Sequence, residues 1–232
     1  MGDNEQTTVT TIVTTTVNSL KLVVTIEGNI ACGKSTLLEC LKDFNSVTVL
    51  PEPIEKWRNW NSVNMPINMP INMLQLLYDN PKKYMKDFQI MGQITLAENH
   101  NLVTVKHKIM ERSIYTGMHV FTMMAYHDGN LTYDEMKEVL HCFEHTKQNI
   151  IQPDIAIYLR TSPEVCYDRL KKRNRAEEAG VTLEYLKRLH DYHEELFIRN
   201  QELLPCPVIV LNANKDPEEV KVKFVSLCNF VV

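Results

Sequence analysis

The sequence predicts an α/β protein with a five-stranded parallel β-sheet covered by helices on both faces. Short apolar runs rich in Val and Ile alternate along the chain with segments of helical periodicity. The 232 residues, 44% of them hydrophobic, are enough to bury one sizeable core. Strands that alternate with helices are typical of parallel sheets buried on both sides.

The strand candidates are short and rich in Val, Ile and Leu; they cover residues 20–26, 47–50, 108–110, 154–159 and 208–211. The helix candidates carry apolar residues at helical spacing and cover residues 35–44, 73–79, 84–100, 133–148, 163–175 and 183–203. Ser162-Pro163-Glu164 predicts a helix start, with a capping hydroxyl, a proline in the first position and an acid in the first turn.

Two segments fall outside this alternation. Residues 1–19 are largely Thr- and Val-rich with few charges, and we expect a flexible tail before a single domain at 20–232. The sequence Asn-Met-Pro-Ile at 64–67 is repeated at 68–71. Two prolines four residues apart exclude a regular helix, and two copies are too few for a solenoid. We therefore predict a loop insertion at 64–72.

The composition excludes several classes of protein. A formal net charge of -4 argues against a general nucleic-acid or membrane-surface binder. The six cysteines include no C-x-x-C pair, which indicates reduced thiols and neither a disulfide framework nor a zinc site. No basic residue precedes Lys21, so we expect no secretory signal or mitochondrial presequence. The expected location is cytoplasmic, with a mitochondrial or nuclear one left open.

Residues 28–35 match the pattern G-x-x-x-x-G-K-[ST] between a predicted strand and a predicted helix. Backbone N–H groups in such a loop, at a helix N-terminus, favour phosphate. Lys34 is expected to reach the β- and γ-phosphates of ATP, and Ser35 to bind Mg²⁺. Cys32 is expected to be a packing residue, with a redox-sensitive thiol as the alternative. The predicted ATP-binding residues of the loop are Gly28, Asn29, Ile30, Ala31, Cys32, Gly33, Lys34, Ser35 and Thr36.

Further motifs follow in order after this loop: Pro51-Glu52-Pro53 with Glu55-Lys56-Trp57-Arg58-Asn59, Tyr78-Asp79-Asn80-Pro81, Glu111-Arg112-Ser113, and Arg173-Asn174-Arg175-Ala176-Glu177-Glu178. With them, residues 20–215 resemble the deoxynucleoside kinases, chiefly the insect multisubstrate and mitochondrial thymidine kinase branches. The resemblance implies a P-loop kinase fold with an Arg-rich lid at 169–178. It also implies transfer of the ATP γ-phosphate to the 5′-hydroxyl of a deoxyribonucleoside for nucleotide salvage, and a homodimer paired through residues 133–148.

The resemblance also implies roles for the charged residues. Glu52 would contact the 5′-hydroxyl and accept its proton, since a carboxylate within reach activates a poor nucleophile. Glu111 would support the metal or accept the proton, and the two carboxylates are not ranked. Arg112 would hold the 5′-oxygen or the transferring phosphate. Arg169 and Arg173 share a helix face and would clamp the phosphates from the lid, so Arg173 joins Lys34 among the catalytic residues.

The nucleoside site follows from the same resemblance. Trp57 and Phe121 would enclose the base, because aromatic faces stack well on heterocycles. The amide of Gln89 presents a donor and an acceptor, which suit thymine in one orientation and cytosine in the other. Tyr78 and Glu178 would hold the 3′-hydroxyl of the sugar.

The base preference depends on two wall positions. Family members that favour deoxycytidine and purines carry an Arg and an Asp beside the base, and the matching positions here are Leu96 and Gly117. An uncharged wall accepts the methyl group of thymine, so we expect thymidine and deoxycytidine to be preferred over purines. The alternatives are a thymidylate-type monophosphate kinase, which would need more arginines near the lid, and a non-catalytic nucleotide-binding protein.

Overall fold

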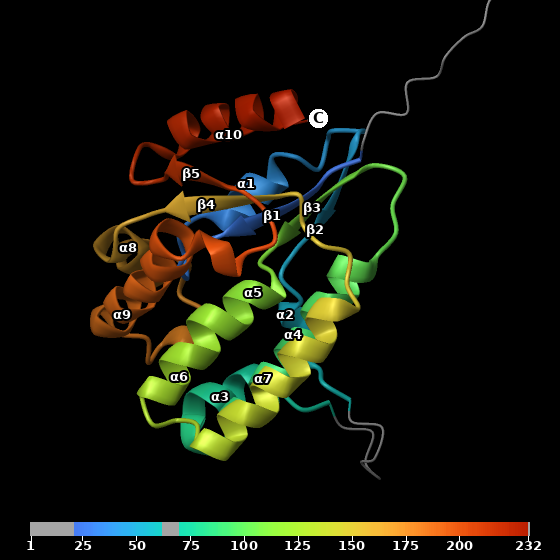
Figure 1. Cartoon of the computed structure of the whole chain (residues 1–232). Helices are drawn as coiled ribbons and strands as arrows, with labels where there is room; N and C mark the ends of the chain where they lie inside the picture. Colours follow the sequence, from blue (N-terminus) through green and yellow to red (C-terminus); the bar gives the residue numbers. More distant parts are fainter. Residues whose placement is uncertain (1–20, 62–69, 232) are drawn as a thin grey trace, which may run out of the picture.

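The computed structural model describes residues 21–61 and 70–231, with a five-stranded sheet at the centre (Figure 1). The strands are β1 (Val23–Glu27), β2 (Val47–Leu50), β3 (His107–Glu111), β4 (Ile155–Arg160) and β5 (Val208–Asn212). Their order is β2-β3-β1-β4-β5 and every pairing is parallel, as predicted. The carboxyl ends of the strands therefore share one edge, where ligands bind in open parallel sheets.

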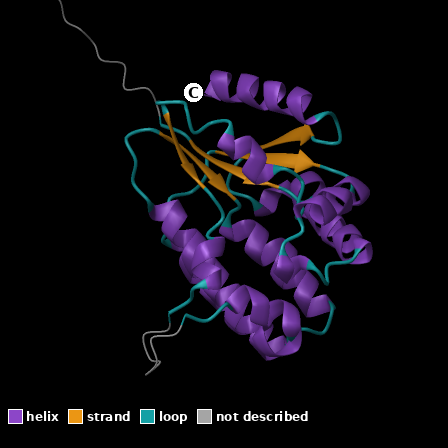
Figure 2. Cartoon of the chain, turned by 180° about the vertical axis from the view of Figure 1, so that it is seen from behind, coloured by secondary structure: helices purple, strands orange, loops and turns teal. Residues whose placement is uncertain are grey.

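Helices cover both faces of the sheet, and the side chains of β4 alternate between them. Ile157 and Leu159 pack with α1 (Lys34–Glu39), α8 (Pro163–Arg173) and α10 (Pro217–Val231). Ala156 and Tyr158 face the opposite way, toward α9 (Leu183–Glu194). Figure 2 shows the sheet between the C-terminal helix and the larger group of helices. This layering explains why the strands read as nearly continuous apolar runs.

The larger group of helices builds a second core beyond the sheet. It contains α2 (Ile54–Arg58), α3 (Met73–Asp79), α4 (Pro81–Asn101), α5 (Ile114–Thr116), the π-helical turn η1 (Gly117–Thr122), α6 (Met123–His127) and α7 (Tyr133–Gln148). Leu96, Tyr115 and Phe143 pack together in its centre. Thr132 and Glu135 form a reciprocal capping box that starts α7. None of the helices in the described ranges has the length and apolar character needed to cross a bilayer.

The structure corrects several helix predictions. The helix predicted at 35–44 ends at Glu39, because the next N–H groups bond three residues back in tight turns that bury Leu41. The pattern at 183–203 is interrupted: α9 runs into the π-helical η3 (Glu195–Arg199), and the 3₁₀ turn η4 (Gln201–Leu203) follows. The predicted Ser162 hydroxyl cap is wrong, since that side chain makes no cap hydrogen bond.

The predicted tail at 1–19 and residues 64–69 of the predicted insertion lie outside the described residues. The ends of the insertion are described. Trp60 and Ile71 form an isolated antiparallel bridge with two N–H···O bonds of 3.0 Å. The Asn72 side chain then accepts from the N–H of Gln75 at 2.9 Å and caps α3. The segment therefore leaves and re-enters the fold at one paired point.

Candidate active site

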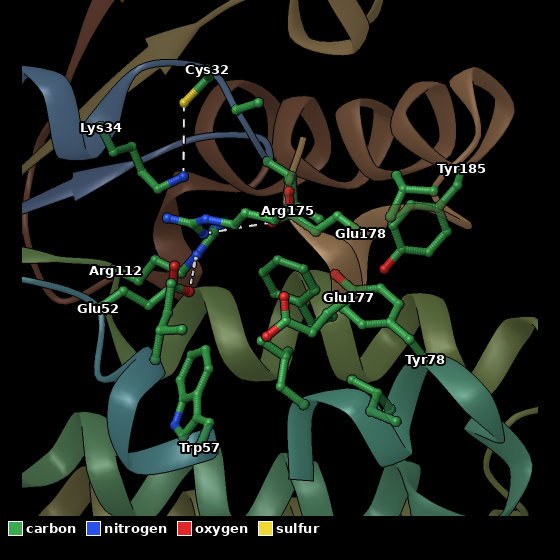
Figure 3. A pocket seen from close by; sticks show the side chains of 18 of the residues that line it. Cys32, Lys34, Glu52, Trp57, Tyr78, Arg112, Arg175, Glu177, Glu178 and Tyr185 are labelled. Carbon is green, nitrogen blue, oxygen red and sulfur yellow. Dashed lines mark hydrogen bonds and ion pairs between the residues drawn. The ribbon is translucent and has the colours of Figure 1, made fainter. Parts of the chain in front are cut away.

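A cavity of about 1070 Å³ extends between the sheet edge and the second helical layer. We call the part around residues 30–37, Glu111 and Arg169 the P-loop end. The other part, the aromatic end, is lined by Trp57, Tyr78, Phe88, Phe121 and Tyr185. In Figure 3, Glu52 and Arg112 lie between Lys34 and the ring of Trp57. The residues assigned to phosphate and to nucleoside thus face one continuous space.

The P-loop has the strand–loop–helix context that its motif predicted. A Cβ at Gly28, where φ is 141°, would lie 2.9 Å from both Cys32 Sγ and the Leu159 carbonyl oxygen, so only glycine fits. Lys34 is buried and its Nζ donates to the carbonyls of Gly28 at 3.2 Å and Asn29 at 2.9 Å. The lysine therefore stabilises the loop by bonding to two of its carbonyls, and it also lines the cavity.

Arg112 joins the P-loop to the carboxylate of Glu52. Its Nε lies 2.7 Å from Glu52 Oε1, its Nη1 donates to the Gly28 carbonyl at 3.0 Å, and its guanidinium stacks 4.8 Å from the Phe121 ring centroid. Burial alone would lower the pKa of Arg112, but the carboxylates of Glu52 and Glu111 raise it overall. The residue has φ 65°, an uncommon conformation outside glycine that aims the side chain into the site.

Glu111 ends β3 beside the P-loop. The Ser35 hydroxyl donates to Glu111 Oε1 at 3.1 Å, and Lys34 Nζ lies 3.9 Å from the same oxygen. Burial raises the pKa of Glu111, and the Lys34 charge opposes that shift only in part. A hydroxyl and a carboxylate in contact are hard oxygen ligands that fit Mg²⁺. No cluster of three His, Cys, Asp or Glu suited to a metal occurs in the described part of the chain. The remaining ligands would be phosphate and water oxygens.

The predicted lid begins in α8 and continues through the 3₁₀ turn η2 (Ala176–Glu178). Arg169 donates to the carbonyls of Cys32 at 2.8 Å and Ala213 at 3.1 Å, which ties α8 to the P-loop. Arg173 Nη2 lies 2.7 Å from both carboxylate oxygens of Glu178. The two arginines predicted to act together therefore have different partners, one at each end of the cavity.

The aromatic end is held by hydrogen bonds and edge contacts. The Trp57 Nε1 donates to Thr95 Oγ1 at 2.9 Å, and its ring meets Phe88 edge to face at 5.3 Å. The Thr122 hydroxyl lies 3.1 Å from Gln89 Oε1. A hydroxyl can donate to the amide oxygen or accept from the amide nitrogen, so Thr122 can support Gln89 in either orientation. The side chain of Thr122 was not predicted to act here.

The residues predicted to contact the sugar and the base wall all line the cavity. Burial raises the pKa of Tyr78, so its hydroxyl stays neutral. Glu178 is buried beside it and lines the same cavity. Leu96 and Gly117 both line the wall, and a Cβ added at Gly117 would meet no atom within 4 Å. The wall therefore has open space at Gly117 and no charge at either position.

Two further features of the site were not predicted. Tyr185 of α9 lines the cavity opposite Trp57 (Figure 3), and burial raises its pKa to about 12. Arg58 and Glu177 form a forked ion pair between α2 and η2. Arg58 and Glu177 stand in motifs named above, but their pairing, like the place of Tyr185 in the cavity, depends on segments that are distant in the chain.

Comparison with known proteins identifies the family of the chain. Residues 24–232 match the family model described as deoxynucleoside kinase. Human mitochondrial thymidine kinase 2 is 36% identical over 204 residues, covering 86% of this chain and 74% of that protein. Deoxycytidine kinase 2 of Gallus gallus is 34% identical over 225 residues (86% and 85%), and mitochondrial deoxyguanosine kinase of Xenopus laevis is 34% identical over 218 residues (83% and 82%). The chain belongs to the deoxynucleoside kinase family and is a phosphotransferase of the P-loop kinase fold.

Proposed function

We propose that this kinase transfers the γ-phosphate of ATP to the 5′-hydroxyl of pyrimidine deoxyribonucleosides, thymidine and deoxycytidine before purines. The observation that carries the proposal is the Glu52–Arg112 pair, which stands where the P-loop end and the aromatic end of one cavity meet. A nucleoside held among the aromatic rings would present its 5′-hydroxyl to this pair. The proposed role in the cell is nucleotide salvage.

The P-loop end binds the donor. Backbone N–H groups of residues 28–36 and the Lys34 ammonium would hold the β- and γ-phosphates. Mg²⁺ would be held by Ser35 and Glu111, where it neutralises phosphate charge. Arg169 stands at the loop already, and Arg173 would reach the phosphates from the lid as charge develops.

Glu52 is the proposed general base. The proton of the 5′-hydroxyl passes to a Glu52 carboxylate oxygen while the 5′-oxygen bonds to the γ-phosphorus and the bond from that phosphorus to ADP breaks. Arg112, at 2.7 Å, orients the carboxylate and stabilises its negative charge. We assign Glu111 to the metal, because its oxygen already contacts Ser35 and Lys34.

Trp57 and Phe121 would enclose the base, Gln89 would bond its edge, and Tyr78 and Glu178 would hold the 3′-hydroxyl. The uncharged wall at Leu96 and Gly117 supports the pyrimidine preference. The test is kcat/KM for the four deoxynucleosides, a ribonucleoside and TMP at one ATP concentration. A purine that equals thymidine contradicts the preference, and faster turnover of TMP favours a monophosphate kinase.

The homodimer is also a proposal. In this chain, α4 packs against α7, and Ile94 of α4 is 43% exposed. An apolar side chain on that helix suits a helix–helix contact between two copies. Sedimentation of the purified protein tests it, and a monomer at micromolar concentration would contradict it.

A further inference from the structure

The forked ion pair between Arg58 and Glu177 joins two segments that each carry a proposed nucleoside ligand. Arg58 Nε lies 2.7 Å from Glu177 Oε1, and Arg58 Nη2 lies 3.3 Å from Oε2. Arg58 directly follows Trp57, and Glu177 directly precedes Glu178. One bridge across 119 positions of sequence therefore connects the base wall to the residue proposed to hold the 3′-hydroxyl.

This pair differs from the ordinary surface ion pairs of the molecule. The Glu177 side chain is 11% exposed and that of Arg58 29%, whereas the two partners of the Lys56–Glu98 pair are both more than half exposed. Hydrogen bonding to Arg58 lowers the pKa of Glu177. A shielded, two-pronged guanidinium–carboxylate contact fixes orientation, while exposed pairs contribute little.

The turn that carries Glu177 needs such an anchor. η2 is a single 3₁₀ turn of three residues, and short turns of this kind have little stability of their own. It contacts α3, the helix that carries Tyr78. Arg173 and Arg175, which precede the turn in the chain, both form ion pairs with the Glu178 carboxylate. Arg58 is thus the contact that holds the turn toward α2.

We propose that Arg58 and Glu177 are positioning residues that hold Glu178 at the correct distance from the base wall, so that the kinase selects nucleosides carrying a 3′-hydroxyl. The inference rests on the proposed role of Glu178. Glu177 lines the cavity beside Glu178, and in this proposal the pair acts on the sugar through the Glu178 carboxylate. Loss of the pair should therefore lower kcat/KM for nucleosides whose 3′-hydroxyl binds Glu178 and have little effect on nucleosides without that hydroxyl.

The test compares thymidine with 3′-deoxythymidine in steady-state assays of the full-length enzyme. For Arg58→Ala and for Glu177→Gln we expect kcat/KM for thymidine to fall about tenfold, mostly through KM, as expected for a lost charged hydrogen bond. The value for 3′-deoxythymidine should change less than about twofold. Combining both substitutions should add little to either one, because they break one contact. Arg58→Lys should be intermediate, since an ammonium cannot form the fork.

Glu55→Gln is the matched control. Glu55 Oε1 accepts from Arg58 Nη1 at 2.8 Å, but its side chain is 78% exposed and belongs to α2, the same helix as Arg58. Like Glu177→Gln, this substitution removes one carboxylate that is paired with the Arg58 guanidinium. We expect wild-type kinetics with both nucleosides. Thermal unfolding of each variant shows whether a loss of activity is a loss of fold, and Arg58→Lys supplies a folded variant if Arg58→Ala is not one.

Glu178→Gln separates this inference from the proposed function. Suppose that Glu178→Gln lowers kcat/KM for thymidine more than for 3′-deoxythymidine, but the Arg58 and Glu177 variants do not. The positioning role is then wrong and the proposed function stands. Equal losses with both nucleosides in the Arg58 and Glu177 variants also overturn the role, because they indicate a general closing contact. If Glu178→Gln affects both nucleosides equally, the assignment of Glu178 to the sugar fails, and this inference fails with it.

Discussion

The two ends of the cavity are built in different ways. The P-loop end is made largely by one contiguous loop, in which a buried lysine is bonded to the loop's own carbonyls. The aromatic end collects side chains from α2, α3, α4, η1 and α9, each held by a few long-range contacts such as Trp57–Thr95 and Arg58–Glu177.

This difference separates the binding of phosphate groups, which is common to all substrates, from the selection of base and sugar, which can vary. Every ATP presents the same phosphates, so a rigid backbone cradle suffices at the P-loop end. A base and a sugar are read by side chains, and a side chain can change without rebuilding the sheet. Substitutions at the P-loop end and at the junction should therefore abolish the reaction, whereas those at the aromatic end should redirect it.

The largest effect is expected at the junction between the ends. Glu52→Gln keeps the size of the side chain but removes the acceptor for the 5′ proton. We expect kcat to fall about 10²–10⁴-fold, the usual range for loss of a general base, with little change in the KM for thymidine. Wild-type turnover in this variant would assign the proton to another group, and Glu111 would be the first to test.

A smaller effect is expected from rewriting the aromatic end. The double substitution Leu96→Arg with Gly117→Asp places a charged pair beside the base. We expect kcat/KM for thymidine to fall about 10- to 100-fold relative to deoxycytidine. This range matches the free energy of hydrogen bonds between charged side chains and the edge of a buried base. The ratio of the two kcat/KM values measures it. An unchanged ratio would show that this wall does not set the base preference.

The P-loop end can be probed by pH. Burial raises the pKa of Glu111, so this carboxyl takes up its proton at a higher pH than an exposed glutamate does. A metal ligand must be ionised, so the ligand is complete above the raised pKa and is lost as the pH falls through it. The Mg²⁺ concentration for half-maximal rate should rise several-fold on the acid side. Thymidine KM should stay flat over the same range, and a parallel change in both would contradict a role confined to the metal.

The smallest effect is expected at the base wall. Trp57→Phe keeps an aromatic face but loses the bond to Thr95, whose hydroxyl can still donate to the Met91 carbonyl at 2.9 Å. We expect a loss of about 1 kcal/mol in the free energy of unfolding, typical of one hydrogen bond. Urea unfolding measures this change, and the KM for thymidine should rise while kcat is kept. A kcat loss near that of Glu52→Gln would show that the ring positions the reacting atoms.

Much of the fold was predictable because its signals are local. The five strands were found from short apolar runs, and the eight residues of the P-loop motif indicated their own strand–loop–helix setting. Glu52 and Glu111 were predicted from the family resemblance, and the structure has them at the carboxyl ends of β2 and β3, on one edge of the sheet.

The rest depends on contacts between distant segments. The helices at 114–127 were missed because that segment is buried on several sides and contains a π-helical turn, so no amphipathic period shows. Ser162 looked like a cap by sequence, yet its N–H bonds to Asn214, more than fifty residues away. The partner of Arg58 could not be chosen among the many acidic residues without the fold.

The continuity of the cavity has a stereochemical consequence. The P-loop end and the aromatic end belong to one cavity, and Glu52 and Arg112 line it between them. The phosphoryl group can pass directly from one oxygen to the other in a single in-line displacement. One displacement inverts the configuration at phosphorus, so an ATP made chiral at its γ-phosphorus should give a nucleoside monophosphate of the opposite hand. Both substrates must then be bound together before either product leaves.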